Sequence, residues 1–248
     1  MTNGEANVMT TGDQQMSAAA RFFGVFTEPV KTFTDIARKP GFWAPLIVMI
    51  LISFGGAEAL IHRVGMEQIV RRSIELSGRA STMSPEQMQQ AVTQGAKFAG
   101  IITPIAALIA VPIVLVIFAA LGLLLLKVIF GASTNFKTAF SVAAHANLAM
   151  LLAGILTLIM IFFGDPANMN PRNLAPTNIG FFLSSQSVGS ALYSLATSVD
   201  LFSFWVLGLL GIGFSAATAG KVRPKSMFFA FFVLWLIYIL LRAGLSLL

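Results

Sequence analysis

One apolar run constrains the fold more than any other feature of the sequence. Residues 98–126 contain no charged side chain and lie between Lys97 and Lys127. A helix needs roughly 20 apolar residues to cross about 30 Å of hydrocarbon. Similar runs fall at about 42–61, 138–163, 192–220 and 227–247. Membrane-spanning segments are helices or closed barrels, and the sequence lacks the alternating pattern of barrel strands. We therefore predict an all-α polytopic membrane protein, a bundle of five transmembrane helices.

The composition agrees with this fold class. Charged residues make up 10% of the chain and hydrophobic residues 56%, whereas about a quarter of a soluble protein is charged. The net charge is +6, but the basic residues lie near the ends of apolar runs, a pattern that orients helices and does not indicate nucleic-acid binding. Cysteine is absent, which excludes disulfides and thiolate chemistry. The two histidines, His62 and His145, are far apart, so no multi-histidine metal site is expected.

Two segments precede the first apolar run. Residues 1–17 are polar and without periodicity, and we expect a disordered tail. Residues 18–41 form an amphipathic segment with basic side chains at Lys31, Arg38 and Lys39. This segment either lies on an anionic membrane surface or packs against the bundle. Residues 42–248 would form the transmembrane domain.

The polar section between the first two apolar runs, residues 63–97, predicts two short helices outside the membrane. Ser84, Pro85 and Gln87 are typical of a helix start, and the helix that begins there should continue into the next span. That span contains Pro104 and Pro112. Each proline removes a backbone hydrogen bond, so both should kink the helix. A split of this longest span at either proline would change the count of five.

The distribution of basic residues predicts an orientation. Short cytoplasmic connections are enriched in lysine and arginine. A cytoplasmic N-terminus with an external C-terminus places most of the short basic connections on the cytoplasmic side, namely Arg21, Lys31, Arg38, Lys39, Lys127, Lys137, Lys221, Arg223 and Lys225.

Five polar residues inside the apolar runs are candidates for function: Glu58, His145, Asn147, Asp200 and Arg242. An ionised group in hydrocarbon costs several kcal/mol unless it is paired or hydrated. At about 1.5 Å per residue, Glu58, Asp200 and Arg242 reach a similar depth near the non-cytoplasmic side. We therefore predict one cluster in which Arg242 pairs with the carboxylates. Each residue also has a structural interpretation: Glu58 could extend to the interface, Asp200 could stabilise the fold, and His145 could hydrogen-bond inside the bundle.

No nucleotide-binding or hydrolytic motif accompanies these residues. The sequence contains no Walker loop, HExxH or GxSxG pattern. We therefore expect no enzyme activity, no catalytic residues, no cofactor and no metal.

Four stretches carry a resemblance to a known family. They are Glu28-Pro29-x-x-Thr32-Phe33 followed by Pro40, then Val199-Asp200-Leu-Phe-Ser-Phe-Trp205, then Gly213-Phe-Ser-Ala-Ala-Thr-Ala-Gly220, and the aromatic-aliphatic C-terminal run. Over roughly residues 20–245 the chain resembles the Yip family (Ypt-interacting proteins). The resemblance implies five spanning helices behind a cytoplasmic N-terminal part. For the eukaryotic members it also implies membrane trafficking through small GTPases.

The segment before the first span departs from the trafficking members. Residues 1–41 lack the long acidic or proline-rich region of those proteins. Small-GTPase binding is therefore not expected, and the chain suits a prokaryotic inner-membrane protein better.

Two functions follow as hypotheses. The first is a non-enzymatic Yip-type protein of membrane organisation or trafficking-like interactions, acting through oligomerisation or a membrane partner. The second is a small-solute or ion transporter, or a subunit of one, with a polar pathway at Glu58, His145, Asp200 and Arg242.

Overall fold

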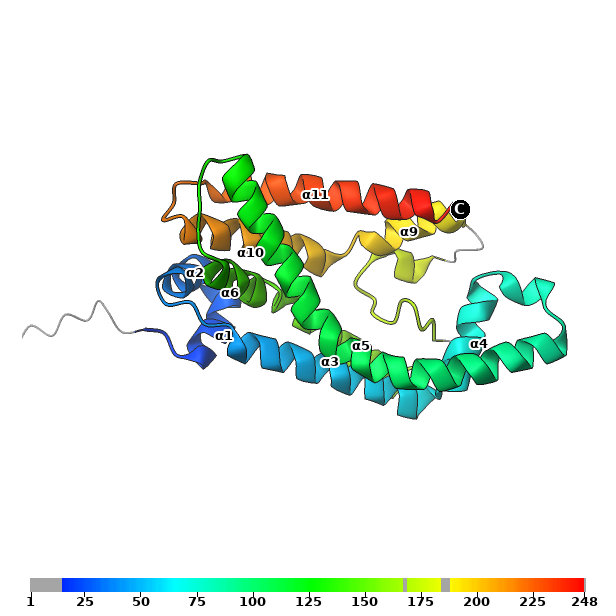
Figure 1. Ribbon diagram of the computed structural model, residues 1–248. Coiled ribbons are helices and arrows are strands. Elements are labelled where there is room, and N and C mark those ends of the chain that lie inside the picture. Colours follow the sequence, from blue (N-terminus) through cyan, green and yellow to red (C-terminus); the bar gives the residue numbers. More distant parts are fainter. Residues whose placement is uncertain (1–14, 167–168, 184–187, 248) are drawn as a thin grey trace, which may run out of the picture.

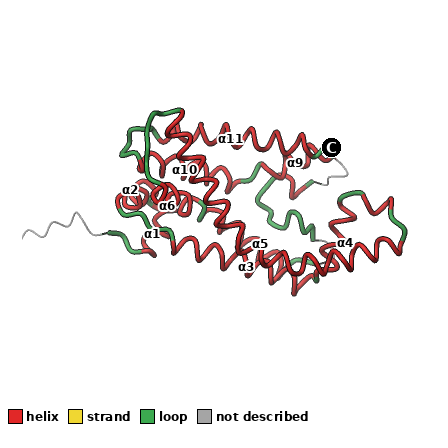
Figure 2. Tube along the Cα trace, viewed as in Figure 1, coloured by secondary structure: helices red, strands yellow, loops and turns green. Residues whose placement is uncertain are grey.

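The computed structural model describes residues 15–166, 169–183 and 188–247. Of the predicted disordered tail, residues 1–14 lie outside the described residues. Within the described part of the chain, the secondary structure consists of helices joined by loops (Figure 2). The elements are α1 (Ala18–Thr27), α2 (Pro29–Arg38), α3 (Trp43–Val64), α4 (Met66–Leu76), η1 (Arg79–Thr82), α5 (Pro85–Val128), α6 (Phe136–Ala146), α7 (Ala149–Phe163), η3 (Ile179–Phe182), α9 (Ser190–Ser198), α10 (Leu201–Ala217) and α11 (Pro224–Leu245).

The all-α, polytopic fold class is confirmed. Among the described residues, four helical stretches are long and apolar enough to cross a membrane: Trp43–Val64, Pro85–Val128, Phe136–Phe163 and Pro224–Leu245. The fifth predicted span, 192–220, is not one continuous helix. It divides into α9 and α10 on either side of Val199 and Asp200, and α10 has 17 residues. The count of five spans therefore stays a prediction that depends on α10.

The longest span does not split at its prolines. α5 is a single helix of 44 residues with Pro104 and Pro112 inside it, and Figure 1 shows it changing direction about half-way along its length. A bend without a break is what the loss of single backbone hydrogen bonds produces. The predicted helix start is also confirmed, because the Ser84 hydroxyl accepts from the Gln87 amide while the Gln87 side chain accepts from the Ser84 amide.

The buried core lies where α2, α6 and α10 meet. In α6, every residue from Thr138 to Ala146 is buried, because α5, α10 and α2 surround this helix. α10 contacts α2, α6, α7 and α11. The small side chains of α6 and the glycines of α10 allow these helices to approach closely.

The N-terminal segment packs against the bundle, which answers the alternative left open by its sequence. α1 and α2 form a helical pair that contacts α6, and α2 also lies against α10. Val25, Phe33 and Ile36 are fully buried there. Lys31, Arg38 and Lys39 remain exposed on the outer side. α1 and α2 lie at one end of the molecule, and the C-terminus lies at the other (Figure 1).

Candidate functional site

Asp200 forms the break between α9 and α10. Its Oδ1 accepts hydrogen bonds from the amides of Phe202 at 2.8 Å and Ser203 at 3.1 Å. These amides belong to the first turn of α10, which has no helical acceptors for them, so the carboxylate acts as the N-cap. No described residue donates a hydrogen bond to Oδ2. Asp200 is 8% exposed, and it lines a cavity described below.

A loop segment completes the backbone bonding at this break. Asn178 and Asp200 form an isolated antiparallel bridge. Within it, the Leu201 amide donates to the Thr177 carbonyl at 3.1 Å and the Ile179 amide to the Val199 carbonyl at 3.4 Å. Unwound backbone inside a membrane protein needs such partners. The loop segment therefore stabilises a non-helical turn within an otherwise apolar run by hydrogen-bonding to its backbone.

Arg242 reaches the same break from α11. Its Nη1 donates to the Ser198 hydroxyl at 2.8 Å, and that hydroxyl donates to the Ser194 carbonyl at 2.8 Å. The guanidinium has five N–H donors, and this is its one hydrogen bond to a described residue. Arg242 and Asp200 form no ion pair with each other, although both line one cavity.

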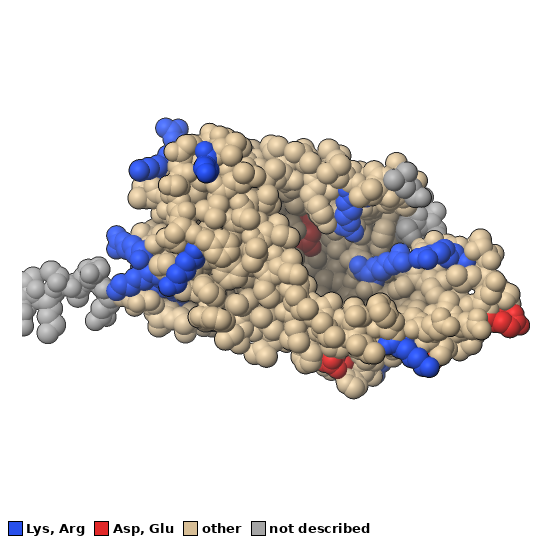
Figure 3. All heavy atoms as spheres, in the orientation of Figure 1, with Lys and Arg blue, Asp and Glu red and all other residues tan. Residues whose placement is uncertain are grey.

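That cavity, which we call the α5–α11 cavity, has a volume of about 570 Å³. It is hollowed into the face shown in Figure 3, where acidic and basic side chains lie in and beside it. Its polar end is formed by the α9–α10 break and the end of α11. Its other end is apolar and is formed by α5, α10 and α11. The residues lining it are Val114, Ile117, Phe118, Leu121, Asn147, Met150, Thr197, Ser198, Asp200, Ser203, Val206, Leu207, Phe231, Leu234, Trp235, Tyr238 and Arg242.

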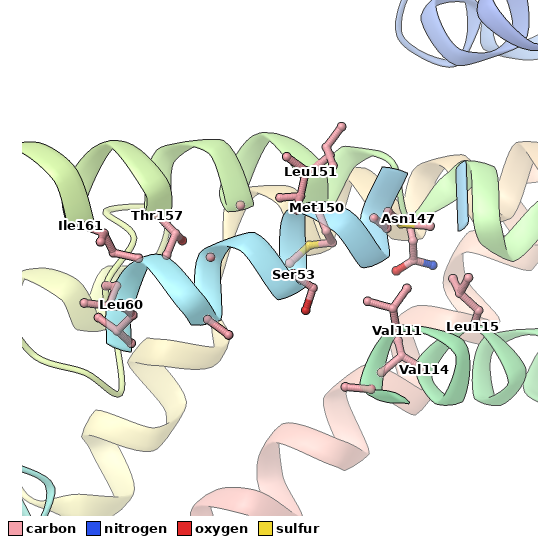
Figure 4. A pocket seen from close by; sticks show the side chains of 17 residues that line it. Ser53, Leu60, Val111, Val114, Leu115, Asn147, Met150, Leu151, Thr157 and Ile161 are labelled. Carbon is pink, nitrogen blue, oxygen red and sulfur yellow. The ribbon is translucent and has the colours of Figure 1, made fainter. Parts of the chain in front are cut away.

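A second cavity, of about 450 Å³, adjoins the first. It lies among α3, α5 and α7 and is almost wholly apolar, with Ser53, Asn147 and Thr157 as its polar side chains. Figure 4 shows these side chains reaching into it from different helices. Val114, Asn147 and Met150 line both cavities. The break between α6 and α7, at Asn147, is therefore the point at which the two cavities meet.

Only part of the predicted three-residue charged cluster is brought together, since Asp200 and Arg242 line one cavity and Glu58 does not. Glu58 lies 3.5 Å from His62, one turn away on α3, and it does not line the α5–α11 cavity. Among the described residues, Arg242 forms no ion pair with Glu58 or with Asp200. Equal depth along three helices did not make their charged side chains neighbours, because depth says nothing about which helices are adjacent or which way a side chain points.

The other two polar candidates have different positions. His145 is 2% exposed, and its Nδ1 lies 2.8 Å from the Ser141 carbonyl oxygen. It lines neither cavity, which favours the structural interpretation. The Asn147 side-chain amide donates to the Ala143 carbonyl at 2.9 Å, and Asn147 lines both cavities. Sequence reasoning did not identify Ser198, although the spacing Ser194, Ser198, Asp200 within an apolar run was a usable signal.

The comparisons with known proteins agree with the sequence resemblance. The Yip1 domain family model matches residues 23–244. The chain is 30% identical over 196 residues to the membrane protein YknW of Bacillus subtilis, which covers 77% of this chain and 75% of that protein. No solved structure matches the chain. A bacterial relative fits the expected prokaryotic type. The match over most of the chain, on an all-α structure with membrane-length helices, shows that this protein is a membrane protein of the Yip1 domain family.

Proposed function

We propose that this protein is non-enzymatic and works by binding: the α5–α11 cavity receives a component of the membrane, and the protein organises its surroundings through that contact. One observation supports this above all others. Asp200 and Arg242 line one open cavity, and neither charge is neutralised by the other. Charged groups inside apolar segments are costly and are kept where they meet a ligand or a polar path. Opposite charges that line one cavity and form no ion pair within the described ranges suit a binding site.

Photo-cross-linking in native membranes tests this proposal. A photoreactive residue at Ile117, which lines the cavity and is 51% exposed, should capture a discrete product. The matched control is Ile237, 49% exposed on α11 and outside the cavity lining, which should capture bulk lipid only. The Ile117 yield should fall when Asp200→Asn and Arg242→Gln are introduced. Identical products at both positions, insensitive to those substitutions, would refute the proposal.

Transport remains a second candidate, and one observation favours it. The breaks at Asn147 and at Asp200 interrupt two apolar runs and face the same cavity. Discontinuous helices that meet at a binding site are typical of secondary transporters. Of the pathway predicted from sequence, Asp200 and Arg242 line this cavity and Glu58 and His145 do not, while Asn147 is a further polar residue in its lining. A solute whose uptake into reconstituted vesicles stops with Asp200→Asn would favour transport over organisation.

We further propose that the protein lies in the prokaryotic inner membrane with α1 and α2 in the cytoplasm and the C-terminus outside. The exposed basic residues of α2 and the basic turn before α11 lie at the end opposite the C-terminus (Figure 1), which supports this orientation.

Cysteine labelling tests this orientation. The chain has no cysteine, so a single introduced cysteine is the only thiol that the reagent can label. In intact cells an impermeant thiol reagent should label Leu247→Cys, and it should label Lys31→Cys only after permeabilisation. Labelling of both from outside would exclude the orientation.

A further inference from the structure

We infer that the α5–α11 cavity binds a zwitterionic phospholipid whose headgroup carries a primary ammonium, with the phosphate at Arg242 and the ammonium at Asp200. This inference rests on the proposed binding function and names the ligand of that site. Four features of the cavity carry it: a polarity gradient, charge complementarity, free hydrogen-bonding capacity and an open apolar rim.

The polarity gradient runs along the helix axes. Asp200, Ser198 and Arg242 form one end, and the lining ends at Leu121 of α5 and Phe231 of α11. Phe231 and Arg242 are separated by a length of α-helix that rises about 16 Å at 1.5 Å per residue. A ligand that fills this space therefore needs a charged end and a hydrocarbon end. A small polar solute would leave the apolar end without a partner.

The two charged side chains at the polar end, Asp200 and Arg242, have opposite signs and form no ion pair with each other. Most N–H donors of Arg242 have no acceptor among the described residues, and a guanidinium suits a phosphate, which it binds bidentately. Asp200 keeps Oδ2 free of hydrogen bonds from described residues and suits a donor cation. A primary ammonium has three N–H donors, whereas a quaternary ammonium has none and a glycerol headgroup has no cation. The pair therefore selects an ethanolamine-type headgroup.

The rim of the cavity allows a lipid to enter from the bilayer. Ile117 of α5 is 51% exposed and Tyr238 of α11 is 60% exposed, and both line the cavity. α5 and α11 make few contacts with each other, so the space between these two helices opens toward the surrounding bilayer. Acyl chains that exceed the cavity can continue over these exposed apolar surfaces. A partner helix would match the apolar walls but would not explain two opposite charges that have no ion-pair partner in the described part of the chain.

Trp235 lines the cavity and provides the probe. A variant with Trp43→Phe and Trp205→Phe retains this single tryptophan and would be reconstituted in phosphatidylcholine vesicles. Equal mole fractions of phosphatidylethanolamine or phosphatidylglycerol with brominated acyl chains are then compared as quenchers. We expect stronger quenching by phosphatidylethanolamine. A control variant with Trp205→Phe and Trp235→Phe keeps only Trp43, which is 67% exposed on α3 and should be quenched equally by both lipids.

Two substitutions distinguish the contact of the ammonium with Asp200 from the contact of the phosphate with Arg242. Asp200→Asn keeps a good N-cap and removes the charge, so it should lower the relative affinity for phosphatidylethanolamine about tenfold, the effect of one charge-assisted hydrogen bond. It should leave phosphatidylglycerol binding unchanged. Arg242→Gln should weaken both lipids, since both carry a phosphate. Circular dichroism melts of each variant in detergent show whether the fold is retained.

Three results of the quenching experiment would overturn the lipid assignment. They are equal quenching of Trp235 by the two lipids, a phosphatidylethanolamine preference that survives Asp200→Asn, and displacement by soluble phosphoethanolamine but not by unlabelled phosphatidylethanolamine. The last would indicate a free solute in place of a lipid. Capture of a second copy of the chain at Ile117 would leave the binding function standing while the lipid assignment failed.

Discussion

Replacing Arg21 by methionine should lower the free energy of unfolding by about 3 to 5 kcal/mol, because it leaves a partly buried carboxylate without its cation. Arg21 is 4% exposed, and its Nε lies 2.6 Å from Oδ2 of Asp35. Its Nη2 donates to the Lys39 carbonyl at 2.9 Å. One guanidinium therefore joins α1 to both the middle and the end of α2. The measurement is denaturant unfolding in mild detergent, followed by circular dichroism.

Two controls show whether the pairing itself is responsible. The double substitution Arg21→Met with Asp35→Leu removes both charges, so it should destabilise the protein less than Arg21→Met alone. Lys31→Met removes a pair with Glu28 in which both side chains are more than half exposed. Solvent screens such a pair, so unfolding should not change measurably. An Arg21→Met protein as stable as the original chain would show that the ion pair does not hold α1 to α2.

Most helices of this fold could be predicted from sequence because their signals are local. The apolar runs predicted both ends of α3 and α11 and the end of α5 to within a few residues. The Ser84, Pro85 and Gln87 pattern predicted the start of α5. The prolines predicted a change of direction in α5, which Figure 1 shows. Each of these features depends on length, hydropathy or the chemistry of neighbouring residues.

The break at Asp200 could not be read in the same way. Its neighbours are apolar on both sides, so average hydropathy runs through it without a change. The break exists because the Asp200 carboxylate caps α10 and because Thr177 and Ile179 bond to the backbone around it. Those partners lie in a loop that is distant in sequence. Aspartate is also a preferred N-cap residue, so the residue type was informative, but its role depended on tertiary contacts.

The candidate site was only partly predictable for a geometric reason. Counting residues along a helix gives depth in the membrane, and Asp200 and Arg242 do share the depth of one cavity. Depth does not give the direction of a side chain or the order of helices around the bundle, so Glu58 was placed with them wrongly. Similarly, an amphipathic pattern at residues 18–41 fits a membrane surface and a protein surface equally well. The burial of Arg21 against Asp35 depends on the pairing of α1 with α2.

Gly213→Leu should destabilise the bundle by about 3 kcal/mol, because no space for a side chain exists where α10 crosses α2 and α6. A Cβ at Gly213 would lie 2.9 Å from Cδ1 of Phe33 and closer still to Cγ1 of Val142. Phe33 and Val142 are both fully buried, so neither can move aside without disturbing its own neighbours. The expected result is an earlier unfolding transition in detergent and faster tryptic cleavage at Arg38 as α2 separates from α10.

Gly208 provides the matched control, since it lies on the same helix and a Cβ there would meet no atom within 4 Å. Leucine has a higher helix propensity than glycine by about 1 kcal/mol in a helix interior. Gly208→Leu should therefore be neutral or stabilising, opposite in sign to Gly213→Leu. If both substitutions changed stability equally, the effect would come from glycine in a helix and not from the α2–α6–α10 crossing. Opposite signs would show that this crossing fixes α10, and with it the position of Asp200 at the cavity.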